Sequence, residues 1–435
     1  MHARSGVQLT SRSSRIYVDR VQSNKVNSGD KKLEGAVRRR LWGIMSDGDA
    51  IWRGRARTLS ERELLLFVVS CFRIDDSAAA IERLKRQIRS SAALWPQIVD
   101  FANRELLAPA LWAALTQKTA TAEVPAESAG RLHRAHALNG IRNERFRGEL
   151  DGILRCLNAV GIVPGLLKGA VDLHISRYSD PAARVLRDLD LLVRKTDHQR
   201  AVAALAALGY RVKEREAGWL THSNDLIRKG AMMPVDLHWF IGGQRDILSP
   251  EEAWADSVIH RVGDVQFRAL SAEHQIVHNL LHSELEDQGS FGFVWPRQLL
   301  DLAALCRLHQ GSIDWVKVHD CFARRGLERV PVARLYLANQ LLGLPLPPGV
   351  RPTLAARLHY VRCLTQLRWR WAMVLAQFAA TILSPLDPRL LDVIYGVGGG
   401  RGELARVRIR HGLRLLSHYG SNLPQVFRNR RRKFT

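Results

Sequence analysis

Apolar residues recur every three or four positions over long stretches on both sides of a central region with a different pattern. In RFRGELDGILRCLNAVG this spacing predicts an amphipathic helix whose apolar face is formed by Phe146, Leu150, Ile153, Leu154 and Leu157. Gly161 and Pro164 follow, and they predict the end of that helix. The same spacing predicts helical chain over residues 61–160 and again over about 250–345.

Between these stretches lie short apolar runs and alternating segments that are typical of strands. We expect strands at IVPGLL (162–167), DLDLLV (188–193) and YRVKE (210–214). The segment DHQRAVAALAALGY predicts a helix that ends at Gly209. DLIRKGAMMPVDLHWF predicts a hairpin that turns near Gly230. The sequence therefore predicts an α/β unit set between helical regions.

Two aspartates share one face of the predicted strand DLDLLV. Alternate side chains of a strand point to the same side, so Asp188 and Asp190 leave one face while the intervening leucines enter the core. In VDLHWF the same alternation places Asp236 and His238 together, opposite the apolar face. If the two strands are neighbours, three aspartates converge.

Such a cluster needs compensation, because two unit charges about 4 Å apart repel by about 4 kcal/mol at an effective dielectric constant near 20. A raised pKa, a bound cation or pairing with the nearby Arg184 or Arg187 would each supply it. Two Mg²⁺ ions held by carboxylates are the arrangement used in phosphoryl and nucleotidyl transfer. We interpret Asp188, Asp190 and Asp236 as candidate catalytic and metal-binding residues, with Mg²⁺ or Mn²⁺ as cofactor.

The segment GLLKGAVDLHISRY places Lys168 and Gly169 after a predicted strand and before a predicted helix. A glycine there lets the backbone approach a phosphate, and a helix N-terminus offers free N–H groups. Lys168 could hold a triphosphate as a point charge. The alternative interpretation of the pair alone is an ordinary turn from strand to helix.

The formal net charge of +23 is concentrated at the two ends of the chain: residues 1–60 carry +8, residues 351–435 carry +13, and the remainder carries +2. This distribution favours contact of the basic C-terminus with an anionic membrane surface or another polyanion, or else solvated tails. The segment Trp371–Leu386 is too short to span a membrane, so we expect a buried or interfacial helix. The five cysteines are scattered and form no CxxC pair, and the N-terminus has no secretory pattern. These features predict a cytoplasmic protein, which the basic C-terminus could hold at the periphery of a membrane.

The order LKGA, Y-x-D, R, DLDLLV and VDLHW resembles the uncharacterised nucleotidyltransferases of the polymerase-β-like superfamily, over about residues 65–345 and most densely over 161–239. The resemblance implies an α+β fold, with a mixed sheet flanked by helical N- and C-terminal regions. It also implies two-metal transfer of a nucleotidyl group from a nucleoside triphosphate to an acceptor.

The resemblance implies a role for each matching residue. Two aspartates form the metal pair and a third follows on the next strand, while the nucleotide is bound by Lys168, Gly169, Arg184 and Arg187. The sequence departs from the pattern twice: Ala170 replaces a serine that helps to bind phosphate, and Arg187 replaces a small residue before the aspartate pair. We expect this arginine either to assist phosphate binding or to pair with an aspartate and weaken metal binding.

Three histidines, His274, His278 and His282, share one helix face in HQIVHNLLHSE. The spacing would permit a metal site. The resemblance also suggests a place along the substrate cleft. Partly buried histidines on a helix packed near the α/β unit are the alternative that we favour over metal ligation.

The function predicted from these features is Mg²⁺-dependent nucleotidyl transfer to a small molecule, a peptide or a protein. The alternatives are a degenerate relative that binds nucleotide or a partner, and a basic nucleic-acid-binding protein. The predicted segments are a basic N-terminal segment (1–60), a helical lead-in (61–160), the nucleotidyltransferase core (161–242), a helical domain over the cleft (243–350) and a basic helical C-terminal region (351–435).

Overall fold

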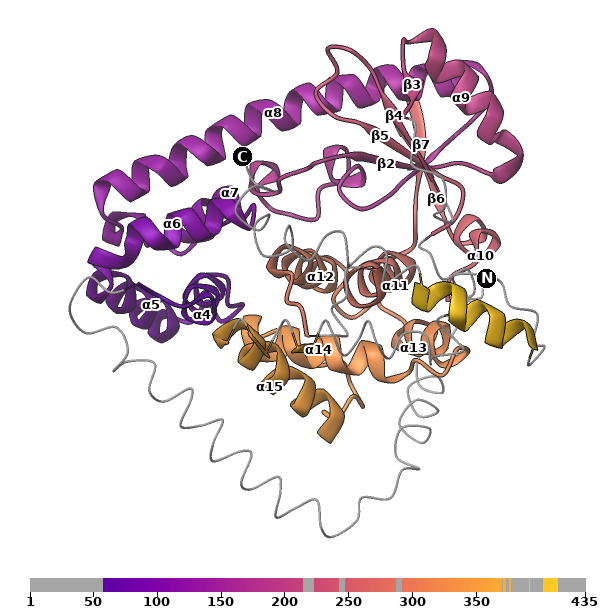
Figure 1. Ribbon diagram of the computed structural model, residues 1–435. Helices are drawn as coiled ribbons and strands as arrows, with labels where there is room; N and C mark the ends of the chain where they lie inside the picture. The colour runs from indigo at the N-terminus through magenta and orange to yellow at the C-terminus, as the bar shows by residue number, and fades with distance from the viewer. Residues whose placement is uncertain are drawn as a thin grey trace, which may run out of the picture.

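The computed structural model describes residues 58–213, 223–241, 247–286, 292–369, 371–372, 375–376, 391 and 402–413. A mixed sheet lies at one end of the molecule and a body of helices lies beside it (Figure 1). This arrangement confirms the predicted α+β fold with a mixed sheet between helical regions. The predictions for the N-terminal 57 residues, and most of those for Trp371–Leu386, lie outside the described residues.

Among the described residues, seven strands form the sheet, in the order β3-β4-β5-β2-β1-β7-β6. Two pairs are parallel, β1 with β7 and β2 with β5, and the other neighbours are antiparallel. The strands are β1 (Gly165–Leu166), β2 (Leu189–Leu192), β3 (Arg211–Val212), β4 (Ser223–Ile227), β5 (Val235–His238), β6 (Val258–Val262) and β7 (Val265–Ala269). The predicted hairpin is confirmed as β4 and β5, with Gly230 at φ +83° in its turn.

The N-terminal helices lead into the sheet through the long helix α8, which crosses the molecule in Figure 1. They are α4 (Glu61–Cys71), α5 (Ala78–Ser90), α6 (Trp95–Arg104), α7 (Ala108–Gln117) and α8 (Ala126–Ala159), with 3₁₀ turns η1 (Ala92–Leu94) and η2 (Thr121–Glu123). Ser60 and Glu63 form a capping box at the start of α4, which satisfies free N–H groups there.

The later helices pack against the N-terminal ones and beside the sheet. They are α9 (His198–Ala207), α10 (Pro250–Ala255), α11 (Ala272–Leu281), α12 (Pro296–Leu308), α13 (Trp315–Ala323), α14 (Arg329–Leu342) and α15 (Leu354–Arg368). Shorter turns are η3 (Val171–Leu173), η4 (Pro181–Ala183), η5 (Lys195–Asp197) and a π-helix, η6 (His282–Glu286). Helices α14 and α15 both contact α4, so helices from the N-terminal and C-terminal parts of the chain pack together in one helical body.

Two large apolar cores correspond to this division. The first lies within the helical body and includes Trp95, Phe67 and Phe322, all fully buried. The second lies between the sheet and the C-terminal half of α8, where the predicted apolar face from Phe146 to Leu157 is buried. The alternation predicted for the strands also holds, because Leu189 and Leu191 belong to this second core.

Two expectations about local structure were wrong. Residues 258–269 were expected to be helical, but they form the hairpin β6–β7, and β7 pairs with β1. The side chains of β6 are all exposed or half-buried, so this edge strand shows no alternation, whereas those of β7 alternate between buried and half-buried. The helix expected after Gly169 is only the 3₁₀ turn η3, so it offers no long helix N-terminus.

Candidate active site

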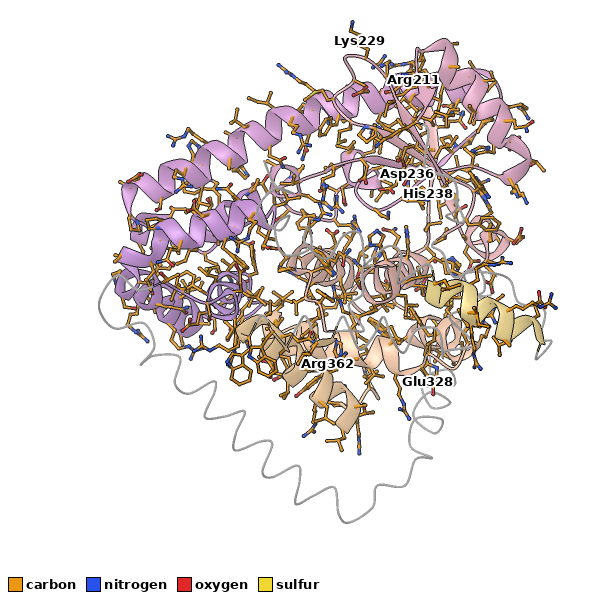
Figure 2. All side chains as sticks on the ribbon, viewed as in Figure 1. Arg211, Lys229, Asp236, His238, Glu328 and Arg362 are labelled. Atoms are coloured by element: carbon orange, nitrogen blue, oxygen red, sulfur yellow. The ribbon has the colours of Figure 1, made fainter. Side chains whose placement is uncertain are left out.

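The predicted aspartates converge where β2 and β5 run side by side. The two strands are parallel, and their register places Asp190 directly beside Asp236. Asp188 immediately precedes β2 and lines the cavity described below. Figure 2 shows Asp236 and His238 at the part of the sheet that faces α11 and α12. The neighbouring strands assumed from the sequence are therefore present.

Asp190 is 1% exposed, and cationic side chains of this chain offset its charge. Its Oδ1 accepts from Lys168 Nζ at 2.9 Å and lies 3.0 Å from His238 Nε2. The same imidazole nitrogen lies 3.2 Å from Oδ2 of Asp236. Burial raises the pKa of Asp190, but Lys168 and His238 outweigh it and hold that pKa well below its usual range. Asp190 is therefore ionised at neutral pH.

The pKa values of Asp188 and His238 shift upward for different reasons. Burial raises the pKa of Asp188, and the negative charge of Asp190 raises it further. Burial alone would lower the pKa of His238, but its hydrogen bonds and charge interactions with Asp190 and Asp236 raise it to about 9. The cluster thus combines carboxylates of unequal proton affinity with an imidazolium held between two of them.

The side chains suit a divalent metal. Within the described ranges, the one group with metal-ligand spacing is Asp190, Asp236 and His238, whose donor atoms all lie within 4.8 Å of one another. Carboxylate oxygens are the ligands that Mg²⁺ and Mn²⁺ prefer, whereas imidazole favours transition metals. Two of the three metal ligands predicted from the sequence, Asp190 and Asp236, belong to this group. The assignment of Asp188 as a ligand stays a prediction.

The Lys168–Gly169 turn follows β1 directly. Lys168 has φ +47°, a left-handed conformation that is uncommon for a residue with a side chain. Its carbonyl oxygen accepts from Arg177 Nη2 at 2.7 Å, which holds the turn in place. The turn directs the lysine side chain onto Asp190, as the 2.9 Å contact shows.

Gly169 provides room for the guanidinium of Arg184. This arginine is 8% exposed and donates two hydrogen bonds to Asp301 of α12, from Nε at 2.9 Å and from Nη2 at 2.7 Å. Its Nε also lies 3.1 Å from Asp172, and Tyr178 Oη donates to Asp301 at 2.6 Å. Arg184, predicted to bind nucleotide, is thus held by two carboxylates, and its contact with nucleotide stays a prediction.

A cavity of about 490 Å³ opens beside the aspartates. Its walls come from the strand ends, the Lys168–Gly169 turn, the residues after α6, helix α11, the π-helix η6 and the start of α12. Charged groups line it: Arg104, Lys168, Arg177, Arg184, Arg187 and Arg297 against Glu105, Asp188, Asp190 and Asp301. The excess of cations suits an anionic ligand.

Two of these cations differ from the rest. Lys168, Arg177 and Arg184 pair with carboxylates, and Arg104 pairs with glutamates. Among the residues that the structure describes, Arg187 and Arg297 form no ion pair, although both line the cavity. Arg187 therefore does not pair with the aspartates beside it, which was one of the two expectations for this position.

The three histidines of the predicted helix face separate. His278 and His282 line the cavity, whereas His274 lies 3.6 Å from Asp256, which is not a lining residue. His282 Nδ1 lies 3.0 Å from Gln298 Nε2 of α12. In the described part of the chain the three do not form a group with metal-ligand spacing. The preferred interpretation, buried histidines beside the α/β unit, agrees with this placement.

Sequence reasoning missed several residues of the site. Asp301 is a lone carboxylate within the apolar helix PRQLLDLAALCRL, and a charge at such a position was the available signal. His238 was placed on the polar face of its strand but was given no role. Arg297 had no distinguishing pattern, because a single arginine at a helix start is common.

The aspartate-bearing strands of a mixed sheet and the cationic cavity beside them are the features expected from the resemblance to nucleotidyltransferases. A family model described as an uncharacterised nucleotidyltransferase matches residues 91–343, more than half of the chain. The protein belongs to this uncharacterised nucleotidyltransferase family, as the resemblance had indicated.

Other comparisons add little. No curated protein matches the chain. Among solved structures, the solution structure of the antibiotic-resistance factor ANT(2'')-Ia is similar at 16% identity and a TM-score of 0.31. The match covers 45% of this chain and 97% of that one. At these values the likeness supports no further conclusion.

Proposed function

We propose that this protein transfers a nucleotidyl group from a nucleoside triphosphate to an acceptor with the help of Mg²⁺ or Mn²⁺. The observation that carries the proposal is the register of β2 and β5, which brings Asp190 beside Asp236 next to a cationic cavity of about 490 Å³. Family membership supports nucleotidyl transfer in general. The proposal names the class of the acceptor, which is a small molecule, a peptide or a protein, and does not name a particular compound.

Each group would have a separate task. Asp188, Asp190 and Asp236 would hold the divalent metal, with His238 as a further donor or as the partner that orients the carboxylates. The metal would supply charge stabilisation at the reacting phosphate. Arg187 and Arg297, which lack an ion pair among the described residues, would bind the triphosphate. Lys168 would join them once a metal replaces it beside Asp190.

The test is incubation of the full chain with each labelled nucleoside triphosphate and Mg²⁺ or Mn²⁺. Pyrophosphate release is measured, and protein and metabolites are searched by mass spectrometry for a nucleotidyl adduct. We expect release with metal, none with EDTA, and a loss of at least about 100-fold in Asp190→Asn. Asp264→Asn, at an exposed turn of the sheet, is the matched control.

Three results would contradict the proposal. Nucleotide binding without pyrophosphate release under any metal would indicate a degenerate relative. Equal turnover of Asp190→Asn and wild type would show that Asp190 is not an essential metal ligand. Binding only to nucleic acid, with a steep dependence on salt, would instead favour the basic nucleic-acid-binding alternative.

We also propose that the basic C-terminal region contacts an anionic membrane surface. Trp369 and Trp371 are 49% and 62% exposed, and their rings stack with centroids 6.0 Å apart. Within residues 402–413, Ile409 and Leu413 are exposed among arginines. Exposed tryptophan and arginine together suit the headgroup region of a bilayer. No helix in the described part of the chain is long and apolar enough to cross a membrane.

A further inference from the structure

His278 is a buried side chain whose chemistry the proposed function has not used. It lies on α11, is 5% exposed and lines the cavity together with Asp188 and Asp190. Its ring centroid lies 6.5 Å from that of His282 in an edge-on arrangement. Among the described residues, neither of its ring nitrogens has a hydrogen-bond partner. A buried imidazole that borders a cavity in this way is available to a molecule inside it.

The surroundings keep this imidazole neutral. The charges that act on it are those of Lys168 after β1, Asp190 on β2, His238 on β5 and His282 at the start of η6. Burial lowers the pKa of His278 well below its usual range, and the positive charges of Lys168 and His282 lower it further, while Asp190 opposes them. A neutral imidazole carries a lone pair that can accept a proton at neutral pH.

We propose that His278 is the general base that removes the proton from the acceptor, and that the acceptor is therefore a hydroxyl or an amine. An acceptor that is already ionised at neutral pH, such as a carboxylate or a phosphate, would need no base. This inference rests on the proposed function and deepens it. It assigns the α11 side of the cavity to the acceptor, and it assigns Arg187 and Arg297 to the triphosphate.

The step balances as follows. The O–H or N–H bond of the acceptor breaks, and its proton moves to a ring nitrogen of His278. The freed electron pair forms a bond to the α-phosphorus of the nucleotide. The bond from the α-phosphorus to the bridging oxygen breaks, and pyrophosphate leaves with that electron pair. No oxidant or reductant is required.

The carboxylates of the site are poorer candidates for this task. Asp190 and Asp236 contact His238, and Asp190 also contacts Lys168. Asp301 accepts hydrogen bonds from Arg184 and Tyr178. Glu105 pairs with Arg104 at 3.7 Å. Asp188 is then the remaining competitor among the lining carboxylates, since its pKa is raised by burial and by Asp190. As a proposed metal ligand, however, it would bind a proton less readily, because the positive charge of the metal favours its ionised form.

The experiment uses the full chain, the nucleotide with the highest pyrophosphate release, and Mn²⁺. Glycerol and ethanolamine serve as hydroxyl and amine probes, acetate and inorganic phosphate as ionised probes, and water as the reference acceptor. We expect His278→Gln to lower kcat about 100-fold or more, with the nucleotide KM within about threefold. Added imidazole should restore part of the activity of His278→Ala. His274→Gln, one turn earlier on α11 and outside the cavity lining, should keep wild-type turnover.

Several outcomes would overturn the proposal. They are unchanged kcat in His278→Gln, a change confined to KM, absence of rescue by imidazole, or preferential transfer to acetate or phosphate. If wild type releases no pyrophosphate from any nucleotide, the proposed function fails first and this inference falls with it. A second readout does not need turnover: ¹⁵N-resolved imidazole resonances should show a neutral His278 at pH 7, and a protonated ring would refute the assignment.

Discussion

Gly169 and Arg184 lie so close that a Cβ atom on the glycine would stand 2.0 Å from Nη1 of the arginine. An arginine tip can usually move aside at little cost. Here it cannot, because the guanidinium is buried and fixed by Asp301 and Asp172. The requirement for glycine at this turn thus comes from an ion-pair network that joins α12 to the strand-end turn.

We expect Gly169→Ala to destabilise the protein by about 3 kcal/mol, the usual cost of breaking a buried ion pair. The methyl group would displace Arg184 from Asp301. The measurement is the free energy of unfolding in urea. Gly152→Ala on α8 is the control, because a Cβ atom there meets nothing within 4 Å. Since alanine favours the helix over glycine, this variant should raise the free energy of unfolding by up to about 1 kcal/mol. Equal stability of Gly169→Ala and wild type would contradict the role given to the network.

Asp301 should make stability depend on pH in the acid range. Burial raises its pKa, but Arg184 and Arg177 and the hydrogen bond from Tyr178 lower it well below its usual range. A carboxyl whose folded pKa is depressed stabilises the fold above its unfolded pKa of about 3.9, and that contribution is lost as the pH falls toward the folded value.

The check is urea unfolding of wild type and Asp301→Asn from pH 7 to pH 3. The variant should be less stable at pH 7, since Arg184 loses its charged partner, and the difference should narrow below about pH 5. If the variant does not fold, Tyr178→Phe removes one hydrogen bond to the carboxylate and should cost about 1.5–3 kcal/mol at pH 7. A difference that is the same at every pH would argue against a titrating Asp301.

His238 should matter for metal binding whether it ligates or orients. Its Nε2 lies 3.0 Å from Asp190 and 3.2 Å from Asp236. We expect His238→Gln to weaken Mn²⁺ binding about 10- to 100-fold, the range typical of partners that hold ligands in place. Electron paramagnetic resonance of free Mn²⁺ measures this without turnover. His198→Gln on α9, which packs against Trp239, is the control, and equal affinities of the two variants would exclude His238 from the site.

The basic C-terminus should bind anionic vesicles but not neutral ones. Each arginine near such a surface contributes about 1 kcal/mol, screened within about 8 Å at physiological salt. Co-sedimentation should fall with added salt and disappear when residues 401–435 are deleted. Replacing Trp369 and Trp371 with serine should weaken binding without abolishing it. Recovery of wild type in the supernatant with both kinds of vesicle would end this proposal.

Local patterns in the sequence determined a large part of the fold. Alternation in DLDLLV and VDLHWF predicted two strands and the direction of their aspartates, and both strands are present as neighbours. The helix through Phe146 and the hairpin at Gly230 were equally predictable. These features depend on how residues within one turn or one strand share a face, so a short window of sequence contains them.

The tertiary structure alone decided which charges meet. Arg184 and Asp301 are 117 residues apart in the chain, and nothing near either one specifies the other. The hairpin β6–β7 was not predicted, although the side chains of β7 alternate between buried and half-buried. Those of the edge strand β6 do not alternate, because all five are exposed or half-buried and neither face of the strand is covered by a core. His278 reaches the cavity, and His274 does not, because packing of α11 beside the strand ends selects among histidines that the helical period treats alike. The sequence by itself thus fixed the side from which each carboxylate leaves its strand, whereas long-range packing decided which lysine, arginine and histidine it faces.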